Sequence, residues 1–574
     1  MPFDVLPPEL ILRVVSYLPI QEIVSFALVS RSFHEVVRVN EGAVYQAAAA
    51  LHGFIKPAKN AESAPHILST VTRIPDATGW LDDVTSWKEL CRRYFLREQA
   101  WRGEQNSPSQ KEQLSLGVFQ SDVIKDIHRF KIDEVERTII CTTGEGGLFV
   151  MSIDTDEILW CLPEWYVSGY AHVEYDNGFI VFTCIEDGVE VWRRSTDSFN
   201  PETYLPCKPN PAQIEGSPSP VPEFPPTFPP VYEPLTRRSA STETPAPSRG
   251  VYLPFALLTS PAEARCYRLV YPHLLVASEF SRQAYIWDVR TSTLAETISI
   301  QTPPRRGGFH LPVHMTYVEL SDSFVFVCWT FALAVYRRGS TPGTKELLFS
   351  IDISEMVHPD PGRKLLGNIP CSIFSGKFQL PYNIVARFLS NPEISPAGTC
   401  TLTKFKKKSY TRESQLDWFT AVHVSPDGRD LVAVTRVGWL LWMPDFQVTS
   451  PKGRSRTPFR LIFTPDQPRY VDYLAFDGKR ILLAIDSGIV SITLKDYIHP
   501  ADPRAAPQIR HLVRLPGRGH HGEGRKVSCL QLHSGSAWFS YIQDEEEDFE
   551  AKLAFVDLTG TSSERNQQRA NLAR

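Results

Sequence analysis

The sequence lacks any run of apolar residues long enough to cross a membrane, which requires about 20 such residues in a helix. The apolar positions from Leu10 to Leu18 begin beside Glu9 and are interrupted by Arg13, unlike the uninterrupted apolar core of a secretory signal peptide. We therefore expect a protein of the cytoplasm, the nucleus or both.

Patterns typical of metal sites and catalytic sites are also missing. The ten cysteines are scattered without a CxxC pair, and the histidines are isolated apart from His520-His521. No GxSxG or HExxH motif occurs, and no catalytic pair of carboxylates can be assigned from spacing. The glycine-rich segment 144–147 has no following Lys-Ser/Thr pair, so we interpret it as a hairpin turn. We expect buried thiols in a reducing compartment, no metal or cofactor, and no enzymatic activity.

Charge of one sign is not strongly in excess either. The 574 residues carry a formal net charge of −5, with 42% apolar and 22% charged residues. This balance gives no electrostatic reason to expect nucleic acid or an anionic membrane as the main partner. Two local runs stand out. The basic run 404–408 fits either a nuclear import signal or a solvated loop, and the acidic tract 544–548 fits an exposed turn.

The first forty residues contain the pattern of three short amphipathic helices. Pro8 suits the first turn of a helix, and Leu10, Val14 and Leu18 recur at helical spacing before Pro19 ends the stripe. A second helix is predicted from about residue 21 and a third around residues 33–37. Such a small unit cannot bury all its apolar faces, so it needs a neighbouring domain or a partner.

These residues resemble an F-box. The resemblance is carried by the Leu-Pro-Pro-Glu-Leu start at residues 6–10, the Leu18-Pro19 break and the Leu-Val-Ser-Arg-Ser-Phe run at residues 28–33. The resemblance implies binding to a Skp-type adaptor, and through it to a cullin. It departs from the family where Phe33 stands in place of the frequent Trp. The alternative is that the helices only cap an ordinary helical domain. The resemblance implies these adaptor-binding residues: Leu6, Pro7, Glu9, Leu10, Leu18, Ile23, Leu28, Val29, Ser30 and Phe33.

A helical linker is predicted for residues 41–103. Ser86 and Glu89 have the spacing of a capping box, and Trp87, Leu90 and Trp101 fall on one helical face. The segment resembles the linker that F-box proteins place before a WD-type propeller, which implies a rigid spacer. A packing helix without that role is the alternative.

From residue 104 to about residue 560 the sequence changes to short β-rich units of the length of propeller blades. Each unit alternates apolar strands with tight turns such as Asn177-Gly178 and Asp427-Gly428, and Trp287-Asp288 ends a strand as in WD repeats. We count about seven units and expect a strand near residues 118–127 to complete the last blade. The alternative is one large β-sandwich or two.

The predicted fold class is therefore multidomain, α plus all-β, with an F-box at 1–40, a helical linker at 41–103 and a β-propeller at 104–560. A Pro-rich insertion at 200–250 is expected to be disordered or extended. Residues 359–412 are expected to form a long loop, and residues 561–574 are expected to form a flexible tail.

The expected function is that of a non-enzymatic substrate receptor of a Skp–cullin–F-box ubiquitin ligase, with protein cargo on the propeller. The cargo could be phosphorylated, but the arginines are too dispersed to assign a phosphate pocket. The alternatives are an adaptor-bound scaffold that does not deliver cargo for degradation, and a propeller hydrolase, which would require acids, histidines or metal ligands facing the central channel.

Overall fold

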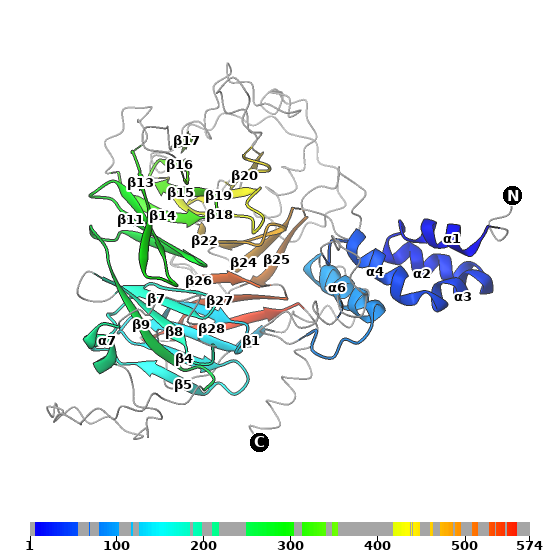
Figure 1. The fold of residues 1–574 in the computed structure, drawn as a ribbon, viewed down its shortest axis with the longest axis horizontal. Coiled ribbons are helices and arrows are strands. Elements are labelled where there is room, and N and C mark those ends of the chain that lie inside the picture. Colours follow the sequence, from blue (N-terminus) through cyan, green and yellow to red (C-terminus); the bar gives the residue numbers. More distant parts are fainter. Residues whose placement is uncertain are drawn as a thin grey trace, which may run out of the picture.

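In the part of the chain that the structure describes, five helices at one end of the molecule precede a ring of seven four-stranded sheets (Figure 1). The structure is a computed structural model. It describes residues 6–55, 68, 80–102, 116–118, 126–183, 188–197, 209–216, 248–302, 313–339, 347–353, 417–436, 438, 440–447, 460–462, 471–485, 488–494, 508–514, 527–533, 535–545 and 548–558.

The helices lie in the segments where the sequence predicts them, but the first one ends at Val15, before the predicted stop at Pro19. They are α1 (Pro8–Val15), α2 (Ile20–Val29), α3 (Arg31–Val39), α4 (Glu41–Leu51) and α6 (Trp87–Arg102). Pro8 occupies the first turn of α1, and Pro19 directly precedes α2. The Ser86 hydroxyl accepts a hydrogen bond of 3.2 Å from the Glu89 amide, which confirms the predicted cap of α6.

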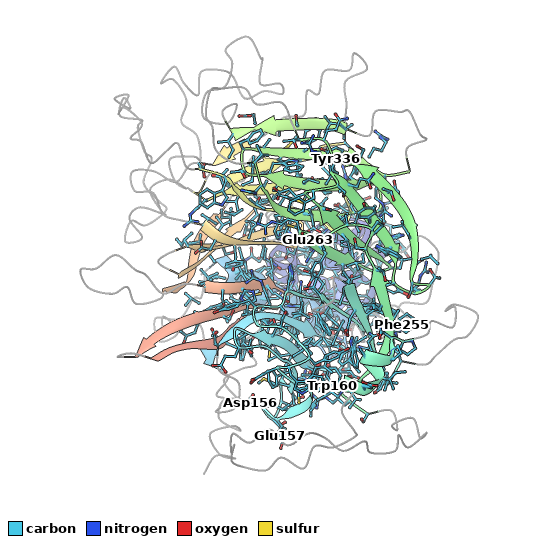
Figure 2. The ribbon with its side chains drawn as sticks, turned by 90° about the vertical axis from the view of Figure 1, so that its left-hand side faces the viewer. Asp156, Glu157, Trp160, Phe255, Glu263 and Tyr336 are labelled. Carbon is cyan, nitrogen blue, oxygen red and sulfur yellow. The ribbon has the colours of Figure 1, made fainter. Side chains whose placement is uncertain are left out.

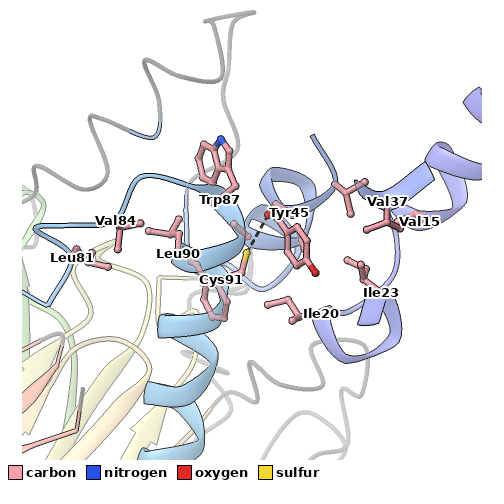
Figure 3. Close-up of a cluster of buried hydrophobic side chains, with 14 of the residues drawn as sticks. Val15, Ile20, Ile23, Val37, Tyr45, Leu81, Val84, Trp87, Leu90 and Cys91 are labelled. Carbon is pink, nitrogen blue, oxygen red and sulfur yellow. Dashed lines mark hydrogen bonds between the residues drawn. The ribbon is translucent and has the colours of Figure 1, made fainter. Parts of the chain in front are cut away.

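One apolar core joins the first helices to α4 and α6 (Figure 3). Val15, Ile23 and Val37 from the first three helices pack in the same cluster as Leu90 and Cys91 of α6. The Cys91 thiol donates a hydrogen bond of 3.2 Å to the Tyr45 carbonyl, and burial raises the pKa of Cys91 to about 12. The thiol is therefore protonated and serves packing.

Seven antiparallel sheets of four strands form the propeller, as predicted from the repeats. Blade 1 contains β2 (Ile127–Asp133), β3 (Thr138–Thr143), β4 (Leu148–Ser152) and β5 (Ile158–Leu162). Blade 2 contains β6 (Val173–Asp176), β7 (Phe179–Thr183), β8 (Gly188–Arg194) and β9 (Tyr252–Thr259). Blade 3 contains β10 (Cys266–Val270), β11 (His273–Ser278), β12 (Gln283–Asp288) and β13 (Thr293–Ser299). The 144–147 segment lies between β3 and β4, so the predicted hairpin turn is confirmed.

Blades 4 to 6 repeat this plan. Blade 4 contains β14 (Met315–Leu320), β15 (Phe324–Trp329), β16 (Ala332–Arg337) and β17 (Leu347–Asp352). Blade 5 contains β18 (Phe419–Val424), β19 (Leu431–Thr435), β20 (Leu440–Met443) and β21 (Arg460–Ile462). Blade 6 contains β22 (Val471–Phe476), β23 (Arg480–Ile485), β24 (Gly488–Thr493) and β25 (Gln508–Arg514). The first strand of each blade contacts the first strand of the next, and β2 contacts β26, so the ring is closed.

The last blade is completed by a strand from before the first blade. It contains β26 (Val527–Leu532), β27 (Ser536–Glu545), β28 (Asp548–Asp557) and β1 (Leu116–Val118), with Leu116 opposite Val556. The sequence analysis predicts that a strand before the first blade completes the last one, and this is confirmed. The strand lies slightly earlier than the expected residues 118–127. The sequence analysis also missed β2, the inner strand of blade 1, because charged residues interrupt its apolar alternation.

Part of the Pro-rich region departs from the expectation of disorder. Residues Pro211–Gly216 form a short helix, α7, whose buried Gln213 amide donates to the carbonyls of Val191 and Ala256. Proline at the first turn and this side-chain anchor on blade 2 explain the helix. The rest of the insertion, residues 200–208 and 217–247, lies outside the described residues, as do the predicted loop 359–412, the basic run 404–408, His520-His521 and the tail 561–574.

Helix α6 attaches the helical part to blades 6 and 7. Trp101, 1% exposed, packs in a cluster with Ala475 of β22 and Leu512 of β25. Arg480, the first residue of β23 after the turn from β22, pairs with Glu98 of α6. This turn follows the inner strand β22, so the helices lie at the end of the ring where the inner strands end. We call the opposite end, where the inner strands begin, the far face.

Candidate functional site

The predicted adaptor-binding residues divide into an exposed group and a buried group. Leu10 of α1 is 52% exposed, and Leu28 and Val29 at the end of α2 are 79% and 71% exposed. Pro7, Glu9 and Ser30 are also exposed. Large apolar side chains left in water on neighbouring helices are typical of a surface that another protein covers.

Ile23 and Phe33 instead lie inside the helical core, 0% and 7% exposed. Phe33 stacks on Phe26 with 4.4 Å between ring centroids, and its amide donates a hydrogen bond of 3.2 Å to the Ser30 hydroxyl. Leu6 and Leu18 are partly buried against the same core. The geometry gives Ile23 and Phe33 the role of holding α2 and α3 together beneath the exposed face.

The sequence analysis did not assign three further apolar residues to the surface, two of them on α1 and α2 and one just after α1. Val14 and Tyr17 are 40% and 66% exposed, and Val24 is 47% exposed. Val14 and Tyr17 follow Leu10 at helical spacing, and Val24 precedes Leu28 by one turn. We call Leu10, Val14, Tyr17, Val24, Leu28 and Val29 the exposed apolar face. The sequence did indicate this face, because the apolar residues of each helix spread over a wider stripe than a single core can bury.

A buried histidine from outside the F-box-like helices orders the start of α2. His52, just after α4, is 1% exposed, and its Nε2 accepts a hydrogen bond of 3.1 Å from the Ile20 amide. The first amides of a helix have no partner within the helix. The side chain of His52 therefore supplies one from α4, which couples the position of α2 to the linker.

We expect His52→Ala to destabilise the helical part by about 1–3 kcal/mol, because the buried Ile20 amide loses its acceptor. Chemical denaturation followed by circular dichroism at the helical signal measures this change. The exposed His34 of α3 provides a control, and His34→Ala is expected to change stability by less than about 0.5 kcal/mol. Equal stability of the two variants would contradict the role given to His52.

A chain of polar contacts runs around the central channel across the inner strands. The Lys131 ammonium lies 3.0 Å from the Glu174 carboxylate, and Arg268 bridges Glu174 and Glu319 at 3.2 and 2.9 Å. His423 lies 2.6 Å from Glu319 and 2.9 Å from the Leu474 carbonyl. These contacts join β2, β6, β10, β14, β18 and β22.

Arg129 of β2 completes this ring at blade 7. Its guanidinium donates to the Tyr473 hydroxyl of β22 at 2.9 Å and to the Ser528 carbonyl of β26. Burial would raise the pKa of Glu174 and Glu319. Lys131 and Arg268 outweigh burial at Glu174, Arg268 and His423 outweigh it at Glu319, and both pKa values lie below the ordinary value. The channel thus contains acids and histidines, as a hydrolase would, but both acids are occupied in ion pairs between blades.

The described residues contain no cluster of three or more histidine, cysteine or acidic side chains arranged to hold a metal ion. Among the helices that the structure describes, none has the length and apolar character needed to cross a membrane.

Comparisons with known proteins find one matching family model and several similar solved structures. The F-box-like family model matches residues 3–41. No curated protein matches the sequence. Solved structures that are similar include the β-propeller domain of Cps50 (Swd1) from Myceliophteria thermophila, at 8% identity and a TM-score of 0.39, covering 77% of this chain and 99% of that one. U3-55K is similar at 9% identity and a TM-score of 0.40, covering 77% of this chain and 98% of that one. Raptor from Chaetomium thermophilum is similar at 9% identity and a TM-score of 0.43, covering 93% of this chain and 38% of that one.

Proposed function

We propose that this protein, which carries an F-box-like domain ahead of a seven-bladed propeller, is the substrate-recognition subunit of a Skp–cullin–F-box ubiquitin ligase. The F-box-like helices bind a Skp-type adaptor, and the propeller binds protein cargo. The observation that carries the proposal is the exposed apolar face on α1 and α2, within the residues that the family model matches. The proposed role is non-catalytic, in the cytoplasm or the nucleus.

The proposed adaptor contact consists of the exposed apolar face together with Pro7, Glu9 and Ser30. Burying a large apolar side chain stabilises a contact by about 1.5–3 kcal/mol. Several such residues on two helices would supply a stable interface. Ile23 and Phe33 contribute indirectly, because they fix the helices that carry the face.

The junction with the propeller supports the receptor role. Helix α6 shares the core of the F-box-like helices at its start and packs on blades 6 and 7 at its end. An ion pair between Glu98 and Arg480 adds a buried polar contact. A continuous, packed connection holds cargo at a fixed distance from the adaptor, as ubiquitin transfer to a lysine requires.

Copurification of the intact chain with the adaptor and a cullin tests this proposal. Capture of both proteins is expected, and failure to capture the adaptor would overturn it. Cargo turnover then separates the receptor from the scaffold alternative. Proteins that bind the propeller should accumulate when the chain is deleted, whereas complexes lost without a change in turnover would favour the scaffold.

A further inference from the structure

A surface on the far face of blades 1 and 2 combines exposed aromatic rings with acidic side chains. It consists of Asp126 before β2, Glu145 between β3 and β4, and Glu164, Trp165 and Tyr170 between β5 and β6. We call these five residues the acidic aromatic patch. Trp165 and Tyr170 are each 67% exposed, and Glu145 and Glu164 are exposed.

Backbone contacts hold the three segments of this patch together. The Gly144 amide donates to the Asp126 carbonyl at 2.9 Å, and the Tyr170 amide donates to the Thr143 carbonyl at 3.1 Å. Gly146 has a φ of 116°, and a Cβ there would lie 2.7 Å from the Val167 carbonyl oxygen. Only glycine permits this close approach. The patch is therefore a fixed arrangement of hairpin and loop.

Two residues of the patch have unusual backbone conformations. Asp126 and Tyr170 have φ values of 55° and 59°, in the left-handed region that non-glycine residues rarely adopt. Both lie against Gly144, where the Asp126 carboxylate and the Tyr170 ring approach the position of a Cβ. Conformations of this kind persist where the surrounding structure imposes them, and they concentrate at binding sites.

Within the part of the chain that the structure describes, no Lys or Arg forms an ion pair with Asp126, Glu145 or Glu164. Burial and the nearby charge of Glu145 raise the pKa of Asp126. The neighbouring His128 is packed against Tyr170 with 5.3 Å between ring centroids, and burial, Arg129 and His172 lower its pKa to about 4. His128 is therefore neutral near pH 7 and adds no positive charge.

We propose that the acidic aromatic patch binds a lysine- or arginine-bearing segment of protein cargo. A cationic side chain over the exposed face of Trp165 or Tyr170 gains a cation–π attraction, and the three carboxylates supply the opposite charge. Both features favour the same partner, because an acidic segment would be repelled and a purely apolar one would leave the carboxylates unpaired. This inference rests on the proposed receptor role and names the class of cargo segment.

The placement of the patch fits cargo binding. The helices attach where the inner strands end, whereas the patch surrounds the starts of β2 and β6, so the patch faces away from the adaptor. Figure 2 views the ring from the side away from the helices. The Ser528 hydroxyl donates to the Ile127 carbonyl at 3.1 Å, which places the start of β26 beside the patch.

An acidic hairpin begins beside the same place. Beyond the pairing of Val527 with Tyr541, strands β27 and β28 continue together as far as Glu545 opposite Asp548. Figure 2 shows these two strands projecting beyond the ring of blades. The described residues at the end of these strands, 544–545 and 548–550, contain acids and no lysine or arginine in the sequence. Acidic positions in the sequence therefore continue along β27 and β28, away from the start of β26.

The test measures binding of fluorescein-labelled Gly-Ser peptides to the full chain by fluorescence anisotropy. One peptide has lysines at alternate positions, a second has arginines there, and a third has glutamates. We expect binding of the lysine or arginine peptide that weakens with salt, and none of the glutamate peptide. The combined change Glu145→Gln, Glu164→Gln and Trp165→Ala should weaken binding about tenfold or more.

A matched control lies on the far face of blade 3. Phe280, between β11 and β12, is 80% exposed, and Glu263, between β9 and β10, is exposed. The combined change Phe280→Ala and Glu263→Gln also removes one exposed ring and exposed negative charge, and it should leave binding unchanged. Absence of binding by the basic peptides, or equal weakening by both sets of substitutions, would overturn the assignment.

Adaptor capture by the same variants separates this inference from the proposed function. The patch variant should capture the adaptor as well as the unaltered chain does, because the patch is on the opposite end of the ring. Adaptor capture without basic-peptide binding would reject the patch alone. Peptide binding that depends on the patch, without adaptor capture, would reject the receptor role and leave the patch as a docking site.

Discussion

Leu10→Asp is expected to abolish capture of the Skp-type adaptor while the protein stays folded. Leu10 is 52% exposed in the free protein, so a carboxylate there is solvated and leaves the helical core intact. In the proposed complex the same carboxylate would be buried against an apolar surface without a partner. This costs roughly 3 kcal/mol or more, which corresponds to at least about a hundredfold loss of affinity. Titration of the adaptor by calorimetry measures the loss.

Two variants distinguish the exposed face from the core and from general surface effects. Ile23→Asp, at a position 0% exposed, should unfold the helical part, which circular dichroism and thermal melting would detect. Val135→Asp, in a propeller turn and 57% exposed, makes the same kind of change away from the face and should leave capture unaltered. Adaptor binding by Leu10→Asp at the unaltered affinity would remove α1 from the proposed contact.

The helices and the blades were predictable because short-range patterns determine them. Pro8, Pro19 and the Ser86 cap mark helix ends, and tight turns such as Asn177-Gly178 separate the strands. Strand β2 was missed because its channel-facing positions carry charge, which hides the apolar alternation. Arg129 and Lys131 find their partners on strands that are far away in the sequence.

The functional surfaces were only partly predictable. Family resemblance implies adaptor contacts for exposed Leu10, Leu28 and Val29 and equally for buried Ile23 and Phe33, because an apolar residue in a motif can serve either the core or the interface. Only packing distinguishes the two. The acidic aromatic patch had no local signal, since its three segments are separate in the sequence and meet through the contacts of Gly144 with Asp126 and of Tyr170 with Thr143.

Glu98→Gln is expected to loosen the attachment of the helices to the propeller. Glu98 is 4% exposed. Its carboxylate forms an ion pair with Arg480 of β23 and a second one, at 3.0 Å, with Arg97. The guanidinium of Arg480 also lies 4.7 Å from the centre of the Trp101 ring. An amide removes the negative charge between two buried guanidinium groups and leaves Arg480 with the more distant Asp477 carboxylate at 3.6 Å. Removing one partner of a buried ion pair costs about 3–5 kcal/mol. Faster hydrogen exchange in α6 and β23, with the other blades unchanged, measures this loosening.

Glu89→Gln on the same helix is the matched control. Its side chain is 33% exposed and pairs with Arg92 and Arg93 on the surface of α6. Exposed pairs of this type contribute about 0–1 kcal/mol, so little change in exchange is expected. Equal exchange in the Glu98 and Glu89 variants would show that apolar packing of Trp101 alone holds the junction.

The dependence of the junction on pH provides a second measurement on Glu98. Burial would raise the pKa of this carboxyl, but Arg480 and Arg97 outweigh burial and lower the pKa from 4.5 to about 2. Because the folded pKa lies below the ordinary value, the ionised carboxylate stabilises the junction fully above about pH 4.5. That contribution is lost as the pH falls from 4.5 towards 2. Exchange in α6 should therefore rise over this range in the unaltered chain, and the rise should be smaller in Glu98→Gln, which has no carboxyl to protonate there. The same rise in both proteins would assign the acid sensitivity to other groups.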